Sequence, residues 1–387
     1  MTGARRRWRV MLLAMALTSP AGIVPEPASA ITWGGVSVPL GYQSWRAKTV
    51  GGTTTRVSQL YFPIVVTTGL GPHADLVLSS SLAGSGAERE GQPANSLDGP
   101  SAFTAQVFLR LAGDRLLVQA GIIPPSGRWG LDAEEMAVAQ AIGLPVFGFG
   151  LKQYGSGLQR GGAATVAFPL SPFANLTVGA GGIHRGEFRL QEGTQSYHPA
   201  SEWALTSGLD LGTPDGAGQP LHLDATYRSF GEDEVDGAKA FAEGDQVELQ
   251  MEGRAGGVAM RSHGFVRAVL KGENTMFSSV GATVASVKAN SGDGYFARLG
   301  LDRPLRGSLR GGADVEWNHV TGSDTFGRNG TAYGIGPALI SPLGRGGATL
   351  ELRGLFQWGV IEGTGGSPDS DLSGFSIFAN FRWRPPS

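Results

Sequence analysis

Apolar and polar side chains alternate with a period of two through most of this chain, and this pattern restricts its fold more than any other feature. Successive side chains of a β-strand point to opposite faces, so the alternation gives each segment one apolar and one polar face. The last segment, Gly374–Arg384, shows the pattern clearly. One face carries Phe375, Ile377, Ala379, Phe381 and Trp383, and the other carries Ser376, Asn380, Arg382 and Arg384, with Phe378 as an apolar exception. The alternation predicts an all-β fold.

Sixteen such segments can be marked, and most of them are longer than a strand of a soluble β-sandwich. They lie near residues 35–46, 55–69, 74–85, 101–111, 115–124, 159–170, 174–189, 200–211, 220–230, 244–254, 257–271, 291–302, 305–320, 328–341, 346–361 and 371–384. Short turns rich in glycine and proline alternate with long polar connections, as in transmembrane β-barrels. Residues 276–288 are assigned to a long connection. Fourteen strands remain if the first segment lies inside the barrel.

The N-terminal residues have the three parts of a secretory signal peptide. Arg5, Arg6, Arg7 and Arg9 precede a short apolar run, and Ala28-Ser29-Ala30 offers a cleavage site. We therefore expect a signal peptide over 1–30 and one β-barrel domain over 31–387. Beyond the signal no run of 18 apolar residues occurs. Insertion into a membrane would therefore require strands, which can span only as a closed barrel. The alternative is a secreted, soluble β-rich binding protein.

The aromatic end of the final segment resembles the closing strand of Gram-negative outer-membrane β-barrels. In those proteins a C-terminal aromatic residue serves as an assembly signal; here Arg384-Pro385-Pro386-Ser387 follow it. The resemblance implies an outer-membrane location, contact with lipid and lipopolysaccharide, and assembly by the barrel-assembly machinery through this strand. Length and strand number are also similar to those of the fatty-acid and hydrophobic-compound channel family. That family's N-terminal hatch and N-P-A box have no counterpart here, so none of its residues is carried over.

Aromatic residues near the ends of the segments suit the headgroup girdle of a barrel. We expect Trp317, Trp358, Phe375, Phe381 and Trp383 to face lipid. The polar faces are expected to line the lumen, and their charged residues are Arg110, Arg254, Arg261, Arg267, Arg298, Arg310, Arg353, Arg382, Glu248, Glu252, Asp302, Asp314, Glu316 and Glu351. Opposed patches across a wet pore would set ion preference, whereas a network of ion pairs would close the lumen.

The longest connection, 125–158, contains the one segment with a helical pattern. Asp132 and Glu135 form a capping-box pattern, and Glu134 and Glu135 suit the positive end of the helix dipole. Gly143 is expected to take the left-handed cap, so the helix should span Ala133–Ile142. The helix either lies on the rim or folds inward and narrows the passage, with Met136 and the alanines against the wall. In the second case its acidic turn should face Arg261, Arg267 or Arg298.

Other classes of function find little support in the sequence. There is no cysteine, and the six histidines are scattered without a zinc, esterase or metalloprotease pattern. The formal charge of −2 argues against nucleic acid as a partner. The four carboxylates of 231–237 are interpreted as a solvated loop, with calcium binding as the alternative. We expect a passive channel or transporter for small solutes, without cofactor or metal. The alternatives are a structural barrel with a closed lumen and a barrel-borne hydrolase.

Overall fold

The computed structural model shows a closed, antiparallel barrel of sixteen strands. It describes residues 36–127, 130–152, 154–189, 196–212, 221–257, 259–280, 283–322, 328–343, 347–363 and 368–383. The first strand pairs with the last from Val36↔Trp383 to Thr49↔Ser370, and this pairing closes the ring. The predicted signal peptide and the last four residues lie outside the described residues. No helix in the described part of the chain has the length and apolar character needed to cross a membrane.

Each of the sixteen predicted segments corresponds to one strand of the wall. In ring order they are β1 (Val36–Thr49), β2 (Thr54–Gly71), β3 (Ala74–Arg89), β5 (Thr104–Leu111), β6 (Leu116–Ile123), β9 (Gln159–Ser171), β10 (Ala174–Arg185), β13 (Glu202–Leu211), β14 (Leu221–Phe230), β17 (Gln246–Gly256), β18 (Arg261–Lys271), β21 (Gly294–Arg306), β22 (Leu309–Val320), β23 (Gly330–Leu343), β24 (Ala348–Ile361) and β25 (Ser370–Trp383). Since β1 belongs to the wall, the number is sixteen and not fourteen.

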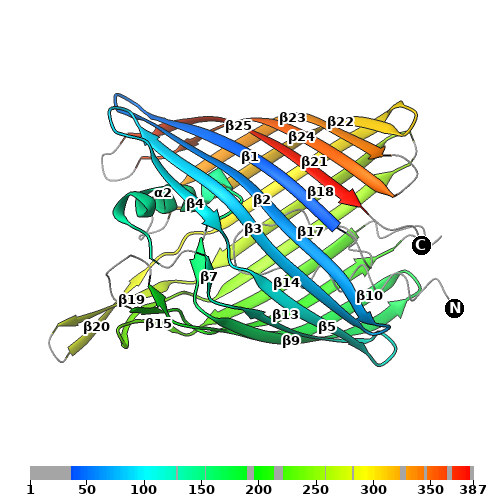
Figure 1. The fold of residues 1–387 in the computed structure, drawn as a ribbon, viewed down its shortest axis with the longest axis horizontal. Coiled ribbons are helices and arrows are strands. Elements are labelled where there is room, and N and C mark those ends of the chain that lie inside the picture. The colour runs from blue at the N-terminus through cyan, green and yellow to red at the C-terminus, as the bar shows by residue number, and fades with distance from the viewer. Residues whose placement is uncertain are drawn as a thin grey trace.

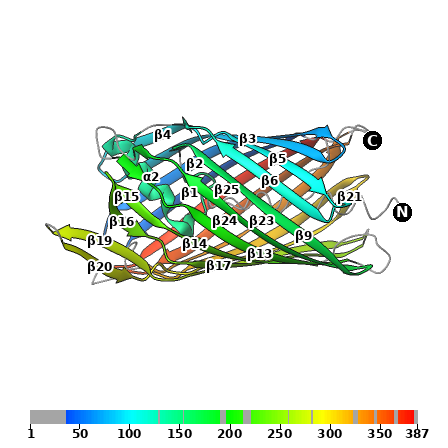
Figure 2. The same cartoon turned by 90° about the horizontal axis from the view of Figure 1, so that it is seen from below.

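The two ends of the barrel differ in their connections (Figures 1 and 2). At the short-turn end, on the right in Figure 1, lie Val36, Trp383 and tight connections such as 112–115. The opposite, long-loop end carries the connections β6–β9, β10–β13, β14–β17 and β18–β21. Pro304 lies within β21, because the strand continues through an irregularity of register to Arg306 before it turns.

The predicted faces are confirmed by which side chains are exposed. Leu249, Leu299 and Phe356 point outward, and Phe356 is 69% exposed. Their polar neighbours point inward, where Glu248 is 3% and Asp314 1% exposed. A soluble sandwich would bury the apolar face and expose the charged one. The described barrel does the reverse, which matches a wall with lipid outside and polar groups inside.

Part of the long connections forms a second, six-stranded sheet at the long-loop end. Its strands are β11 (Phe188–Arg189), β12 (Ser196–His198), β15 (Glu232–Val235), β16 (Ala238–Ala242), β19 (Asn274–Val280) and β20 (Thr283–Ala289). Residues 276–288 thus lie outside the wall, as expected, although they form a β-hairpin. Within the acidic run, Asp233 accepts hydrogen bonds from Tyr197 and from the Ala200 amide, and Glu232 pairs with Lys239. Polar stretch 86–100 also contains a strand, β4 (Asn95–Pro100), which continues the line of β5 beside β3.

The expected aromatic girdle residues point outward. Trp317, Trp358, Phe375, Phe381 and Trp383 are all among the exposed large side chains. The rings of Tyr333 and Trp358 stack with centroids 6.0 Å apart, near the long-loop end of β23 and β24. Trp383 lies at the other end of the barrel. On the opposite face of β25, Asn380 is buried and accepts a hydrogen bond from Ser37 Oγ at 3.1 Å, across the β1–β25 seam.

Candidate functional site

The candidate site is the interior of the barrel, where charged side chains pair along the wall. Glu248 accepts from Arg228 (2.6 Å) and Arg267 (2.7 Å). Other pairs that involve predicted lumen residues include Arg110–Asp75 (3.3 Å), Arg254–Glu252 (3.0 Å), Arg298–Asp314 (2.9 Å), Arg298–Glu316 (3.5 Å), Arg310–Asp302, Arg353–Asp314 (3.6 Å), Arg353–Glu351 and Arg382–Glu351 (3.7 Å). Arg261, at the short-turn end, has no carboxylate within 4.0 Å in the described part of the chain. The charges are therefore arranged mainly as lateral pairs between nearby strands.

One of these pairs spans an intervening strand, and small residues make it possible. Arg353 lies on β24 and Asp314 on β22, with Gly336 of β23 directly opposite Asp314. The inward face of β23 is Gly330, Ala332, Gly334, Gly336 and Ala338. A Cβ atom at position 336 would lie 1.8 Å from the Gly354 carbonyl oxygen. Because this face carries no long side chain, the guanidinium of Arg353 can reach across it.

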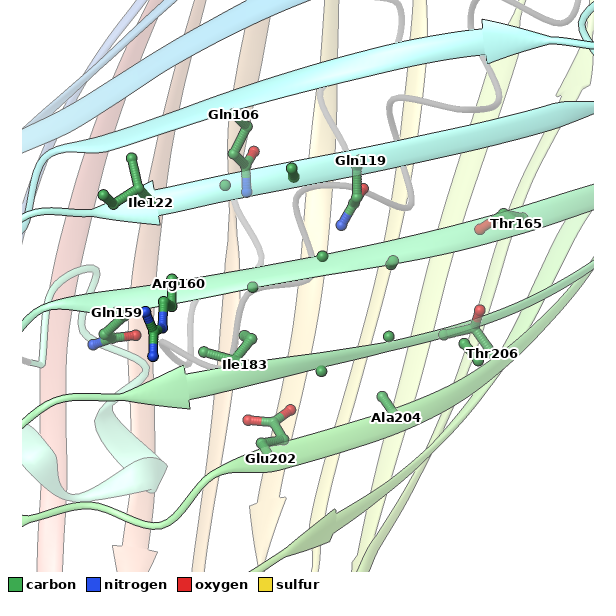
Figure 3. Close-up of a pocket in the computed structure, with 18 of the residues that line it drawn as sticks. Gln106, Gln119, Ile122, Gln159, Arg160, Thr165, Ile183, Glu202, Ala204 and Thr206 are labelled. Atoms are coloured by element: carbon green, nitrogen blue, oxygen red, sulfur yellow. The ribbon is translucent and has the colours of Figure 1, made fainter.

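An open pocket lies on the inner side of β5, β6, β9, β10, β13 and β14 (Figure 3), and its empty space, open solvent included, is about 1050 Å³. Most residues that line it are small or have neutral, polar side chains. The strands that follow in the ring carry ion pairs instead. Gln106, Gln119, Gln159, Thr165, Ala204 and Thr206 are among the residues that line it. Its charged lining residues are Arg160, Glu202 and Arg228. The pocket thus combines amide, hydroxyl and charged groups at an unfilled part of the lumen.

The long connection between β6 and β9 enters the barrel. Its helix, α2 (Ala133–Gly143), begins at Asp132, whose carboxylate accepts from the Glu135 amide at 2.8 Å. Glu135 in turn accepts from the Asp132 amide at 3.1 Å, so the predicted capping box is confirmed. The predicted left-handed cap at Gly143 is wrong. The helix ends in extended backbone at Leu144, because Pro145 starts a 3-10 helix, η1 (Pro145–Phe147), and Gly148 takes the left-handed conformation.

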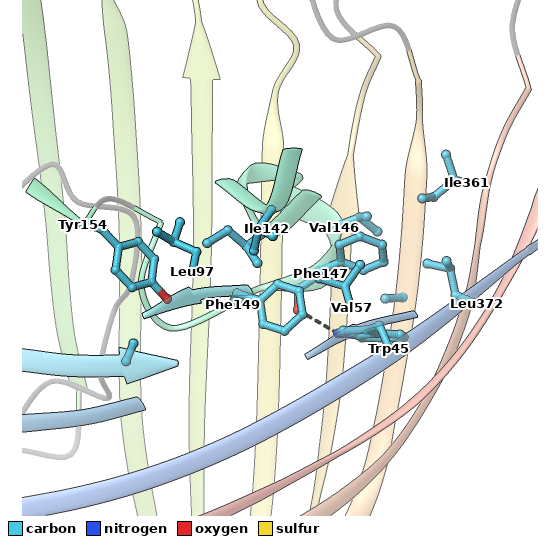
Figure 4. Packing of buried hydrophobic residues seen from close by; sticks show 13 residues of the cluster. Trp45, Val57, Leu97, Ile142, Val146, Phe147, Phe149, Tyr154, Ile361 and Leu372 are labelled. Atoms are coloured by element: carbon cyan, nitrogen blue, oxygen red, sulfur yellow. Dashed lines mark hydrogen bonds between the residues drawn. The ribbon is translucent and has the colours of Figure 1, made fainter. Parts of the chain in front are cut away.

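Apolar residues of this connection pack against inward-facing side chains of the wall (Figure 4). Val138, Ile142, Val146, Phe147, Phe149 and Tyr154 form a buried cluster with Trp45, Val57, Leu97, Ile361 and Leu372. The wall members come from β1, β2, β4, β24 and β25. The side chains of Met136 and Glu135 are partly exposed, and those of Asp132 and Glu134 are exposed. These contacts are those of a segment inside the barrel and not of a helix on its rim.

Polar anchors fix the backbone of the same segment. The Phe147 carbonyl accepts from Trp45 Nε1 at 3.0 Å and from Gln43 Nε2. Gln59 binds both backbone groups of Leu151. Its Nε2 donates to the Leu151 carbonyl, and its Oε1 accepts from the Leu151 backbone N–H, each at 2.7 Å. Asn318 of β22 donates to the Val146 carbonyl at 2.9 Å. Backbone groups without regular partners thus find them on the inner wall.

That the acidic first turn of α2 faces Arg261, Arg267 or Arg298 stays a prediction. The helix contacts β2, β3 and β4, whereas Arg267 and Arg298 lie on β18 and β21 and pair with wall carboxylates. The same connection carries Lys152. Burial, and then repulsion from Lys271 and Arg267, lowers the pKa of Lys152 to about 8.

One serine–histidine pair bears on the alternative of a barrel-borne hydrolase. His184 Nδ1 lies 3.1 Å from Ser201 Oγ at the long-loop end. Within the described residues no carboxylate lies within 4.0 Å of His184 to orient its ring. A triad needs such a third group. This pair therefore lacks the geometry of an activated nucleophile.

Several interior residues were missed at the sequence level. Glu202 and Arg228 occupy alternate, inward positions of correctly predicted strands, so the period-two pattern already contained their signal. The apolar run Leu144–Phe149 was a second signal, because a solvated loop rarely carries such a run. Lys152 gave no signal, because its neighbours depend on how the connection crosses the lumen.

No protein-family model and no curated protein sequence matches this chain. Solved structures match it at low similarity. Pseudomonas putida OprB, in a high-pH structure, is 11% identical, and the match covers 90% of this chain and 94% of OprB with a TM-score of 0.42. An outer membrane channel from Pseudomonas putida F1 is 9% identical, and the match covers 93% of this chain and 99% of the channel with a TM-score of 0.39. A mutant of Rh. blastica porin is 14% identical, and the match covers 90% of this chain and 100% of the porin with a TM-score of 0.33. Similarities this low do not assign the chain to a family, and they do not identify a solute.

Proposed function

We propose that this protein is a passive channel for small polar solutes in the outer membrane of a Gram-negative bacterium. The observation that carries the proposal is an unfilled part of the lumen, lined by small residues and by glutamine, threonine and charged side chains, inside a closed barrel whose outer face is apolar. Lipid requires the apolar outer face, whereas polar solutes require hydrogen-bonding groups within. The signal peptide and the C-terminal aromatic strand support export and assembly. By this proposal the long-loop end faces outward from the cell and the short-turn end faces the periplasm.

In this proposal the segment 130–152 is the constriction. It occupies the interior along β1, β2, β24 and β25, and leaves the space along β5–β14 unfilled. Solutes would therefore pass between the neutral arc around Gln119 and Thr206 and the ion-paired strands from β13 onward. The paired wall charges favour the second candidate, a structural barrel with a closed lumen. Single-channel recording in planar bilayers distinguishes the two, because only an open passage gives discrete conductance steps.

Filling the pocket should lower the conductance. Ala204 lines the pocket on the inner face of β13, and its neighbour Leu205 points outward. Ala204→Trp should reduce the single-channel conductance at 1 M KCl, because an indole would occupy the passage. Leu205→Trp, a substitution on the lipid side of the same strand, should conduct like the parent. Equal conductance of the Ala204→Trp variant and the parent would show that ions take another route.

The location in the membrane has a separate test. The folded barrel should fractionate with the outer membrane and run at a different apparent mass before and after boiling, because a closed hydrogen-bonded ring resists unfolding by detergent. Recovery of the protein as a soluble periplasmic monomer would contradict the proposal.

A further inference from the structure

The floor of the pocket consists of glycine and alanine. The inward positions that meet in register on β6, β9, β10 and β13 are Gly121, Gly161, Ala163, Gly181 and Ala204. A Cβ atom on Gly181 would lie 2.6 Å from the Cβ atom of Ala163, so a larger side chain does not fit there. Glycine inside a strand allows a ligand to approach the backbone closely. The small residues therefore keep this part of the lumen free for a solute.

Three threonine hydroxyls border this floor in one row across the strands. Thr165 of β9 and Thr206 of β13 both lie opposite Gly179 of β10, and Thr226 of β14 lies opposite Thr206. A Cβ atom on Gly179 would lie 2.6 Å from Thr165 Oγ1 and 2.8 Å from Thr206 Oγ1, so both hydroxyls converge on the space above this glycine.

Thr165 is the member of this row whose hydroxyl most favours a ligand. It is only 8% exposed, lines the pocket (Figure 3), and makes no hydrogen bond within the described part of the chain. A buried hydroxyl without a partner is unfavourable, and a polar group that enters the pocket and bonds to it removes that cost.

Two glutamines on the β5–β6 side of the pocket add further groups of this kind. The side chains of Gln106 and Gln119 have no hydrogen bond among the residues that the structure describes. By contrast, Gln43 and Gln59, on the inner faces of β1 and β2, both bond to the constriction segment. Amides and hydroxyls can donate as well as accept. The pocket thus presents uncommitted neutral groups that match the hydroxyls of a solute.

The charges beside the pocket are already paired. Glu202 pairs with Arg185 and, at 3.3 Å, with Arg228, which in turn pairs with Glu248 at 2.6 Å. Arg160, the third charged lining residue, is exposed and belongs to the outward alternate positions of β9. An ion that left water for this pocket would have to compete with these existing pairs for a counter-charge.

We infer that this pocket is a subsite for uncharged solutes that carry several hydroxyls, such as small sugars and polyols. The inference rests on the proposed channel function and adds the class of solute. The threonine hydroxyls and glutamine amides bond to the hydroxyls of the solute, and its C–H groups lie against the glycine and alanine floor. A charged solute of the same size should bind more weakly, because its charge finds no unpaired partner on this wall.

Blockade of the ion current by glucose tests the subsite in the full-length, reconstituted protein. A solute held in the lumen obstructs ion flow, so glucose should lower the single-channel conductance at 1 M KCl and pH 7 in a saturable manner. Glucuronate has the same ring and one carboxylate, and it should bind less tightly by about threefold or more, because the charge must be desolvated. Tighter binding of glucuronate than of glucose would overturn the assignment to uncharged solutes.

Two substitutions locate the subsite. Thr206→Val removes a hydroxyl with little change of shape, and Gln119→Met removes an amide from a side chain of similar length. Each should weaken glucose binding by about threefold or more, the effect of one lost hydrogen bond. Thr68→Val, on the exposed outward face of β2, is the matched control and should bind glucose like the parent. Unchanged glucose affinity in both Thr206→Val and Gln119→Met would reject the subsite.

Failure of the channel function and failure of the subsite can be told apart. If the parent gives no conductance steps, the proposed function fails. Calorimetric titration with glucose, in a detergent without a sugar headgroup, then tests the subsite alone. The parent should bind glucose, and Thr206→Val should bind it more weakly. Conductance steps that glucose leaves unchanged, or a titration in which the parent binds no glucose or binds it no better than Thr206→Val, would show that this pocket is not a sugar subsite.

Discussion

Replacing residues 131–150 with a glycine–serine linker of equal length is expected to raise the single-channel conductance severalfold. The replacement removes α2, η1 and the apolar cluster that Val138, Phe147 and Phe149 form with the inner wall. A flexible, polar linker has no apolar side chains to pack against Trp45, so nothing holds it inside the barrel. The wall should stay intact, because the backbone hydrogen bonds of its strands join them to each other. Single-channel recording at 1 M KCl measures the effect.

Width and charge must be separated in that experiment, because the linker also removes Asp132, Glu134 and Glu135. The triple variant Asp132→Asn, Glu134→Gln, Glu135→Gln removes the same charges and keeps an N-cap residue, since asparagine caps helices as well as aspartate does. It should move ion preference toward anions without a large change in conductance. The linker variant should show both effects. A linker variant that folds and conducts like its parent would show that this segment does not set the width.

Leu299→Arg is expected to destabilise the barrel by about 2–4 kcal/mol, the cost of an arginine on the lipid face near the bilayer midplane. Leu299 is 50% exposed, points outward, and lies near the middle of β21, between Gly264 of β18 and Val315 of β22. Reversible urea unfolding in lipid vesicles measures the change in the free energy of unfolding.

The matched control for this substitution is Leu305→Arg on the same strand. Leu305 is also exposed but lies next to the turn after Arg306, at the short-turn end. Near the interface the cost should fall to about 0–1 kcal/mol. Equal losses at both positions would mean that β21 does not cross the bilayer with Leu299 near its midplane.

The wall of this protein could be predicted from its sequence because one local rule governs it. Each strand must present one face to an apolar and one to a polar environment, so the pattern is visible within ten residues. The hairpin of β19 and β20 shows the limit of that rule, since its alternation is similar and only its place between two longer strands assigned it to a connection. The number of strands in turn depended on whether β1 joined β25, a pairing of residues about 340 positions apart.

The interior was harder to predict because its contacts are not local. Arg353 and Asp314 meet only because Gly336 between them has no side chain, and their separation in sequence gives no sign of this. Leu151 is fixed by Gln59 of β2, a residue 92 positions earlier in the chain. The sequence identified the helix and its N-cap, which depend on neighbours three positions apart. The orientation of the helix depends on its contacts with β2, β3 and β4.

The apolar cluster also bears on the order in which the molecule is completed. Trp45 belongs to the first strand and Leu372 to the last, and both pack in the cluster that contains Phe147. The binding surface for the segment is therefore complete only after β1 and β25 have met. We therefore expect Phe147 to dock after the ring has closed, and its contacts with both strands to hold the seam together. If the segment is the proposed constriction, the passage would narrow only once assembly of the barrel is complete.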